Sequence, residues 1–296
     1  MLLTKRLELI TRSALWAIRP EAIGPLVFKL TEGRVMTVEE VTAAMLAVKP
    51  VMMGKSGNQT AVIPVLGVLT KDGPAWYGSN YDTIANAVEQ AGTDPNVKRV
   101  VLSVDSPGGE VTGLPETAAL IAQVAKVKPV SAIVEGQSAS AAYWLTTQAR
   151  DVSVTPSGEV GSVGVRLMHV DMSKMLEDAG YKVTELHSGE FKTEWSPFQP
   201  LSDAAKEDMQ CRLDATHADF INAVACGRGA RATADISTRR FGEGRMFSSG
   251  DALTHGMVDK IQTPRDFMRS ALAVEEAPPS FPVRARARVE LERGRL

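Results

Sequence analysis

The sequence predicts an α/β protein built around a largely parallel sheet. Its 296 residues are 44% hydrophobic and 23% charged, which is ordinary for a globular chain long enough to bury a sizeable core. From residue 61 onward, short β-branched runs alternate with segments whose apolar residues recur at helical spacing. Parallel strands need a crossover connection, usually a helix, so this alternation predicts strand–helix–strand layers.

The predicted strands are short runs bounded by polar turns. They are "AVIPVLGVLT" (61–70), "RVVLSV" (99–104), "PVSAIV" (129–134), "DVSVTP" (151–156), "GSVGVRLMHVD" (161–171) and "KVTELHS" (182–188). Helices are expected over 81–92, 114–127 and 173–180, with Gly92 as the C-cap of the first. One longer amphipathic helix of about 25 residues should begin after Ser202 and end at Gly227.

Composition divides the chain into three regions. Residues 1–58 contain helical pieces broken by prolines and are predicted to form an N-terminal helical arm. Residues 59–266 carry the strand–helix pattern and should form a single domain. Residues 267–296 end in a stretch rich in proline and arginine with little core material, so a disordered tail is expected.

Several protein classes are disfavoured by charge and cysteine content. The net charge of −2 gives no basic footprint for nucleic acid. Cys211 and Cys226 lie about 22 Å apart on one predicted helix, beyond disulfide reach, and no metal-type spacing is present. No cofactor is therefore expected. Neither a signal peptide nor a run of about 18 apolar residues is found, so we expect a soluble cytoplasmic protein.

Two stretches suggest chemistry. "DSPGG" (105–109) follows a strand, and paired glycines can turn backbone N–H groups outward as an oxyanion hole requires, although a simple turn would look the same. "GQSASAAYWL" (136–145) joins a strand to a helix-like segment. A serine there would present its hydroxyl at a helix N-terminus, where developing negative charge is favoured. Position alone does not choose between Ser138 and Ser140, and close packing of small residues is the simpler reading.

A nucleophilic serine needs a base. His169, which follows the glycine-rich "GSVGV", is the only tempting histidine, because His187, His217 and His255 lie at structural positions. A lysine can serve instead when burial favours its neutral form. Lys192 in "HSGEFKTEWSPF" has Phe191, Trp195 and Phe198 around it as desolvating material, although most loop lysines are simply exposed.

Together these motifs resemble the signal peptide peptidase A family of serine proteases, and especially its phage branch of capsid-assembly (head maturation, protein C-type) proteases. The resemblance runs from about residue 61 to 261 and rests on five motifs in order: "DSPGG", "SASAAYW", "GEVGSVGV", "SGEFKTEWSP" and the long helix. The family uses a Ser-Lys dyad, one of the alternatives to a Ser-His-Asp triad. It implies a spiral of ββα units shared with Clp proteases and crotonases, and assembly into homo-oligomeric rings.

The resemblance also implies roles for particular residues. The nucleophile matches Ser140, the base matches Lys192, and a second serine that orients the lysine amine matches Ser162. The oxyanion N–H groups would come from Gly108 or Gly109 and from Ala141. Where the family has two glycines after the nucleophile, this chain has Ala141 and Ala142.

The resemblance implies a serine endopeptidase that cleaves scaffold, capsid or portal proteins during phage head maturation. A bacterial signal-peptide-degrading protease of the same family is the nearest alternative. A crotonase-like acyl-thioester enzyme would share the fold and the glycine loop without needing the serine and lysine together. An inactive capsid-assembly scaffold protein is the third alternative, motivated by the arginine-rich tail.

Overall fold

The computed structural model describes residues 16–18, 50–71, 78–231, 241 and 243–273. Its main sheet has the strand order β2-β3-β4-β5-β6-β9, and the strands from β3 to β9 are parallel. These strands are β2 (Val51–Lys55), β3 (Asn58–Leu69), β4 (Val97–Glu110), β5 (Val130–Ala139), β6 (Asp151–Val154) and β9 (Lys260–Ile261). The predicted α/β class is confirmed.

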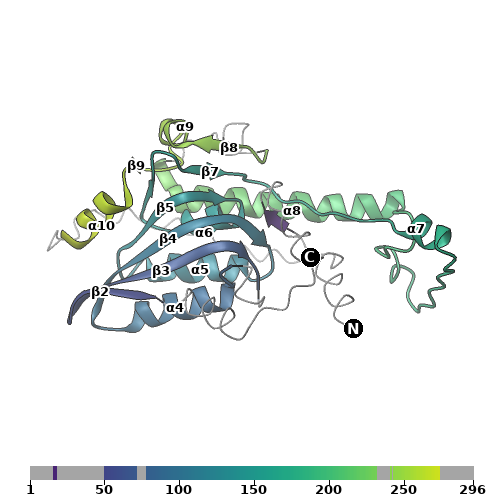
Figure 1. The fold of residues 1–296 in the computed structure, drawn as a ribbon, viewed down its shortest axis with the longest axis horizontal. Coiled ribbons are helices and arrows are strands. Elements are labelled where there is room, and N and C mark those ends of the chain that lie inside the picture. Colours follow the sequence, from purple (N-terminus) through teal and green to yellow (C-terminus); the bar gives the residue numbers. More distant parts are fainter. Residues whose placement is uncertain (1–15, 19–49, 72–77, 232–240, 242, 274–296) are drawn as a thin grey trace, which may run out of the picture.

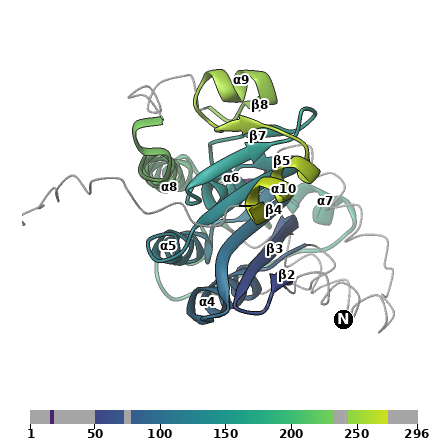
Figure 2. The same cartoon turned by 90° about the vertical axis from the view of Figure 1, so that its left-hand side faces the viewer.

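Helices connect the parallel strands as the alternation predicts. They are α4 (Tyr81–Thr93), α5 (Leu114–Val124) and α6 (Ala141–Thr146), and the long helix α8 (Asp203–Arg228) lies beside them. Figures 1 and 2 show these helices on one face of the sheet, with α10 (Pro264–Ala273) on the other. Three short strands extend the sheet: β1 (Trp16–Ile18), β7 (Glu159–Gly161) and β8 (Met246–Ser248), the last followed by α9 (Ser249–Thr254).

Period-two alternation along the strands separates two cores. On β4, Val100, Leu102 and Val104 are buried in the large core beneath α4, α5, α6 and α8. Val101 of the same strand points the other way and packs with Ile133 and with Phe267 of α10. Both faces of the central strands are thus covered, which is usual for parallel sheets.

A long excursion leaves this body between β7 and α8. Residues 166–201, which we call the arm, contain the short helix α7 (Ser173–Asp178) and otherwise irregular chain. In Figure 1 the arm carries α7 to the far end of the molecule, and α8 returns the chain to the body. Ser196 is the one buried residue of the arm. We use "body" for residues 50–165 and 203–273 as far as the structure describes them.

The N-terminal helical arm predicted over residues 1–58 lies mostly outside the described residues. Its described parts include the strands β1 and β2, and the turn at Gly57 folds β2 back on β3 as a hairpin. Two other expectations differ from the structure. Residues 182–188 are exposed and form no strand, since no neighbouring strand offers them a ladder. The packed region extends past residue 266, where the tail was expected to begin, because Phe267 packs α10 (Pro264–Ala273) on the sheet. The rest of the predicted tail lies outside the described residues.

Smaller differences concern where elements end. β4 runs through "DSPGG" to Glu110, where a turn was expected, and β7 stops at Gly161, so most of the strand predicted over 161–171 is irregular. The helix α4 ends one residue beyond Gly92, and α8 passes Gly227 to reach a C-cap at Gly229. The predicted N-cap of α8 is confirmed, because the Ser202 hydroxyl accepts a hydrogen bond from the Ala205 N–H.

Candidate active site

Ser140 occupies a sharp turn between β5 and α6. Its backbone angles are φ 54° and ψ −121°, a region that residues with a side chain rarely enter. Among the described residues, only Ser140, Ser162 and Glu243 combine a side chain with positive φ. A serine held in a strained strand-to-helix turn is the arrangement of the nucleophile elbow in α/β hydrolases, and such strain concentrates at functional sites.

Small residues and a rigid helix make this turn possible. Ala139, Ala141 and Ala142 are fully buried around Ser140. The helix α6 is fixed to the body by Trp144, whose ring stacks on Phe220 of α8 at a centroid distance of 4.8 Å. The Ala141 N–H stands at the first position of α6, where helix amides have no intrahelical carbonyl to bond.

The Tyr143 hydroxyl also fixes α6, because it donates a hydrogen bond to the carbonyl oxygen of Met257. Burial raises the pKa of Tyr143 well above its ordinary value, although the nearby Arg228 opposes the shift. The phenol therefore stays neutral and keeps donating at physiological pH.

Ser138 has a separate structural contact. Its hydroxyl lies 2.9 Å from the Thr146 hydroxyl, and both side chains are fully buried. The hydroxyl of Ser138 therefore ties β5 to the end of α6. Of the two serines that sequence position left open, the structure places only Ser140 at the turn.

The "DSPGG" segment lies beside this turn as part of β4. Ser106 pairs with Ser138 in the β4–β5 ladder, so the two glycines that follow lie level with Ser140. The Gly108 N–H donates to the Ser106 hydroxyl oxygen at 3.1 Å, and the Ser106 hydroxyl in turn donates to the Gly67 carbonyl. A Cβ at Gly109 would collide with the carbonyl oxygen of Leu69, so this close approach requires glycine.

Ser162 lies on the other side of Ser140, directly after β7. It is buried, has φ 53°, and its N–H donates to the Arg245 carbonyl. The Ser140 hydroxyl donates to the carbonyl oxygen of Gly164 at 3.2 Å. The three segments named by the sequence motifs (β4, the β5–α6 turn and the chain after β7) therefore meet in one place.

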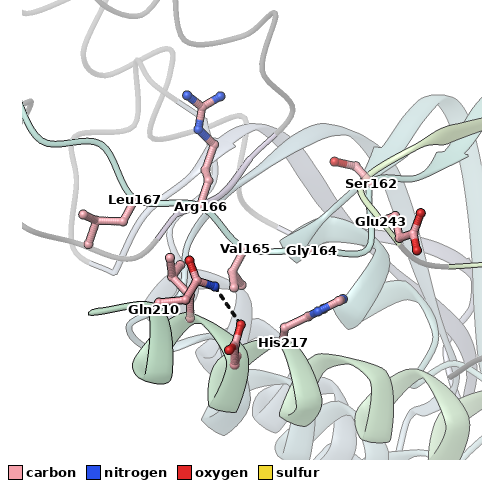
Figure 3. A pocket seen from close by; sticks show the side chains of 11 residues that line it. Ser162, Gly164, Val165, Arg166, Leu167, Gln210, His217 and Glu243 are labelled. Carbon is pink, nitrogen blue, oxygen red and sulfur yellow. Dashed lines mark hydrogen bonds between the residues drawn. The ribbon is translucent and has the colours of Figure 1, made fainter. Parts of the chain in front are cut away.

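A pocket of about 450 Å³ opens beside Ser162 (Figure 3). One wall is the chain at 164–167, and the opposite wall is α8, which contributes Gln210, Asp214 and His217. The Gln210 side-chain amide donates to the Asp214 carboxylate at 2.8 Å. The Nε2 atom of His217 is buried and has no hydrogen-bond partner among the described residues.

Sequence reasoning missed this polar wall and treated His217 as structural. The residues are spaced i, i+4 and i+7, which places them on one face of α8. That spacing was the available signal, but their relation to Ser162 depends on the tertiary fold.

Lys192 is not brought to Ser140 within the chain. It lies in the arm, where its side chain is exposed and Phe191 beside it is 65% exposed. Among the described residues, the hydroxyl of Ser140 bonds the Gly164 carbonyl and not an amine or imidazole. His169 instead bonds the Ser196 carbonyl within the arm. The predicted aromatic enclosure of Lys192 is therefore missing in the single chain.

Potential metal ligands do not cluster in the part of the chain that the structure describes. Within it, no three histidine, cysteine, aspartate or glutamate side chains gather closely enough to hold a metal ion. The free thiols Cys211 and Cys226 are exposed on α8.

The fold and the turn at Ser140 define an α/β protein with a candidate serine nucleophile beside a glycine-rich strand. The model of peptidase family S49 matches residues 122–276, which is more than half of the chain. The chain belongs to peptidase family S49.

The relatives include both phage and cellular proteins. Capsid assembly protease C of Escherichia phage lambda is 32% identical over 73% of this chain and 50% of its own length. Head-tail preconnector protein GP5 of Enterobacteria phage P21 is 31% identical over 74% of this chain and 44% of its own. Protease 4 of Salmonella typhi is 31% identical over 70% of this chain and 33% of its own length. The chain therefore spans about half or less of these relatives.

A solved membrane-bound stomatin-specific protease, in complex with a substrate peptide, is 14% identical with a TM-score of 0.42, covering 73% of this chain and 80% of that one. Within the part of the chain that the structure describes, each helix is too short or too polar to span a bilayer.

Proposed function

We propose that this chain is a serine endopeptidase in which Ser140 is the nucleophile and Lys192 of a neighbouring copy is the base. The observation that carries the proposal is that the two residues lie in different regions of the chain. Ser140 is held in a strained turn of the body, whereas the predicted base, Lys192, lies on the exposed arm. Membership of a peptidase family favours proteolysis over the thioester alternative.

The arm has the surface expected of a docking element. More than half of the large apolar side chains exposed in the described chain belong to it: Met168, Val170, Met175, Tyr181, Val183, Leu186, Phe191 and Phe198. Apolar residues gathered on one exposed element mark an interaction site. A second copy of this chain is the occupant that would both cover them and supply the missing amine. Desolvation by that docking would favour the neutral amine that a base requires.

The proposed reaction then runs on side chains and backbone alone. The neutral Lys192 amine takes the proton of the Ser140 hydroxyl, and Oγ forms a bond to the peptide carbonyl carbon. The N–H groups of Ala141 and of Gly109 (or Gly108) hold the oxyanion, and each is worth about 3 kcal/mol. The ammonium protonates the departing amine, which leaves an ester on Ser140. Water, deprotonated by the same lysine, then hydrolyses that ester.

Ser162 is proposed to orient the incoming amine. It lines the pocket described above, and its φ of 53° fixes its backbone there. The buried, unpartnered Nε2 of His217 on the opposite wall leaves that pocket with polar groups still to satisfy.

The test is complementation between two inactive variants. Ser140→Ala and Lys192→Ala should each lower cleavage of fluorescein-labelled casein by about a thousandfold or more. When the two variants are co-assembled, one interface in four pairs an intact serine with an intact lysine, so about a quarter of the activity should return.

The matched control is a Ser140→Ala/Lys192→Ala double variant co-assembled with Ser140→Ala, which should stay inactive. Mixed assemblies of the two single variants that remain inactive would exclude the shared dyad. Ser140→Ala that still cleaves casein would exclude this nucleophile.

The proposed substrates are scaffold, capsid or portal proteins of a phage head, because the phage relatives are named for capsid assembly and head–tail connection. The cellular alternative rests on the similarity to Protease 4. Incubating the active chain with head proteins encoded beside its gene, and with a signal peptide, distinguishes the two by which one it cleaves. Activity in the host cytoplasm, without membrane insertion or nucleic acid, is part of the same proposal.

A further inference from the structure

The strand β1 lies where an extended peptide would have to lie to reach Ser140. Its backbone pairs antiparallel with the end of β4, in the register Trp16↔Glu110, Ala17↔Gly109 and Ile18↔Gly108. In Figure 1 it is the short purple arrow at the arrowhead of β4. Its partner segment therefore contains Gly108 and Gly109, one of which is proposed to donate to the oxyanion.

The edge of β4 that β1 occupies can be identified from the pairing. A strand has two edges, and at Gly108 and Gly109 one of them is taken by Val68 and Leu69 of β3. The other edge belongs to β5 as far as the Ser106↔Ser138 pair, after which β5 ends and the chain turns at Ser140. β1 thus occupies the row of the sheet that β5 leaves at the nucleophile.

The distances along the strand place β1 next to the reacting atoms. Gly108 lies two residues beyond Ser106, about 7 Å along β4, and Ser140 lies two residues beyond Ser138. The Ile18 end of β1, opposite Gly108, is therefore the end beside Ser140. A peptide that added to this edge as a strand would present its carbonyl between Ser140 and the glycine amides.

We propose that residues 16–18 are a built-in competitor for the peptide-binding edge of β4, so that an incoming peptide must displace β1 before it can meet Ser140. The proposal rests on the proposed function, since it takes that edge as the place of the substrate. The partner that this edge of β4 would bind is an extended peptide backbone, and β1 occupies the edge in the same way.

The edge itself is held in place independently of β1. The Tyr81 hydroxyl donates to the Glu110 carbonyl at 2.6 Å, and the Lys71 N–H donates to the Glu110 carboxylate at 2.9 Å. With β3 paired along the opposite edge, the end of β4 keeps its shape when β1 leaves. Displacement therefore exposes a ready strand edge.

The test separates binding from cleavage by using the Ser140→Ala background. The probe is a fluorescein-labelled synthetic peptide of residues 13–20, followed by fluorescence anisotropy on the full chain. A strand tethered in the same chain competes at an effective concentration of about 1 mM, so it should weaken a peptide of about 100 µM affinity roughly tenfold. Freeing the edge should recover that factor.

A pair of proline substitutions tests whether freeing the edge changes binding, because only one of the two removes a hydrogen bond to β4. Successive N–H groups of an antiparallel strand alternate between facing the partner and facing away. One of Ala17→Pro and Ile18→Pro therefore removes a donor to β4, while the other removes an outward N–H and acts as the matched control. No described strand pairs with the outer edge of β1, so the outward proline is tolerated there.

We expect one of these variants to bind the peptide about tenfold more tightly than the Ser140→Ala chain and the other to bind within about twofold of it. Equal binding by all three chains, with unchanged melting temperatures, would overturn the competitor role. Peptide binding does not need the Ser-Lys dyad. The anisotropy result can therefore be interpreted even if the complementation test fails, and the complementation test can be interpreted even if the peptide does not bind.

Discussion

The body and the arm of this chain use their apolar side chains in opposite ways. In the body, residues such as Phe220 and Leu102 are fully buried, and the turn at Ser140 is enclosed by alanines. In the arm, Leu186 is 94% exposed and Phe191 is 65% exposed. The body can thus hold a strained serine without the arm, whereas the arm leaves its large apolar side chains exposed, as expected of the proposed docking element.

The largest difference in the free energy of unfolding should come from truncating one aromatic residue in each region. Phe220→Ala removes a fully buried ring stacked on Trp144 and should destabilise the fold by about 3–5 kcal/mol. Phe191→Ala is the matched control in the arm and should change stability by less than about 0.5 kcal/mol. Urea unfolding measures both free energies. Similar losses for the two variants would show that the arm is packed as tightly as the body.

A smaller effect is expected at the ion pair that joins α8 to the chain before β9. Arg228 is fully buried, and its guanidinium bonds both oxygens of Asp259, at 2.8 and 3.0 Å. Burial alone would raise the pKa of Asp259, but hydrogen bonds from Arg228 and the Val152 N–H, with the charges of Arg228 and Arg231, hold it below its ordinary value.

Asp259→Asn should therefore destabilise the body by about 3 kcal/mol at pH 7. A lowered native pKa means that the carboxylate stabilises the fold above its unfolded pKa, near 4, and that this contribution is lost as the pH falls further. In thermal melting from pH 7 to pH 3, the melting temperatures of the unmodified protein and the Asp259→Asn variant should converge in acid. A gap that stays constant with pH would exclude the charge as its cause.

The smallest effect on folding, with the sharpest effect on assembly, is expected in the arm. Leu186→Asp should change monomer stability by less than about 0.5 kcal/mol and yet shift the assembly to smaller species in sedimentation velocity, with loss of activity. Val127→Asp, at a residue exposed on the body, is the control and should leave assembly unchanged. If both variants assemble normally, the arm is not the docking element.

Most of the body was predictable because its signals are local. Short β-branched runs bounded by polar turns predicted β3, β4 and β5, and helical spacing with a serine cap predicted α8. The same local signals failed at 182–188, where a strand-like pattern has no partner strand, and at α10, whose place depends on Phe267 meeting Val101 and Ile133.

The candidate site was predictable in its parts and unpredictable in its arrangement. Motif resemblance selected Ser140 and Ser162, and both carry the positive φ angles that sequence alone does not reveal. The separation of Lys192 from Ser140, and the pairing of β1 with Gly108 and Gly109, are long-range relations. No spacing along the chain encodes them.

The strained turns also explain why the proposed nucleophile, Ser140, belongs to the body. Two serines held at φ near +54° cost about 1–3 kcal/mol each, out of a total stability of about 5–15 kcal/mol for a typical domain. Such conformations persist only where the surroundings leave the backbone no alternative. The arm has one buried residue and could not enforce them. A lysine amine needs no strained backbone, so it can be supplied by an exposed element such as the arm. A serine held in an unfavourable backbone conformation needs the packed core of the body around it.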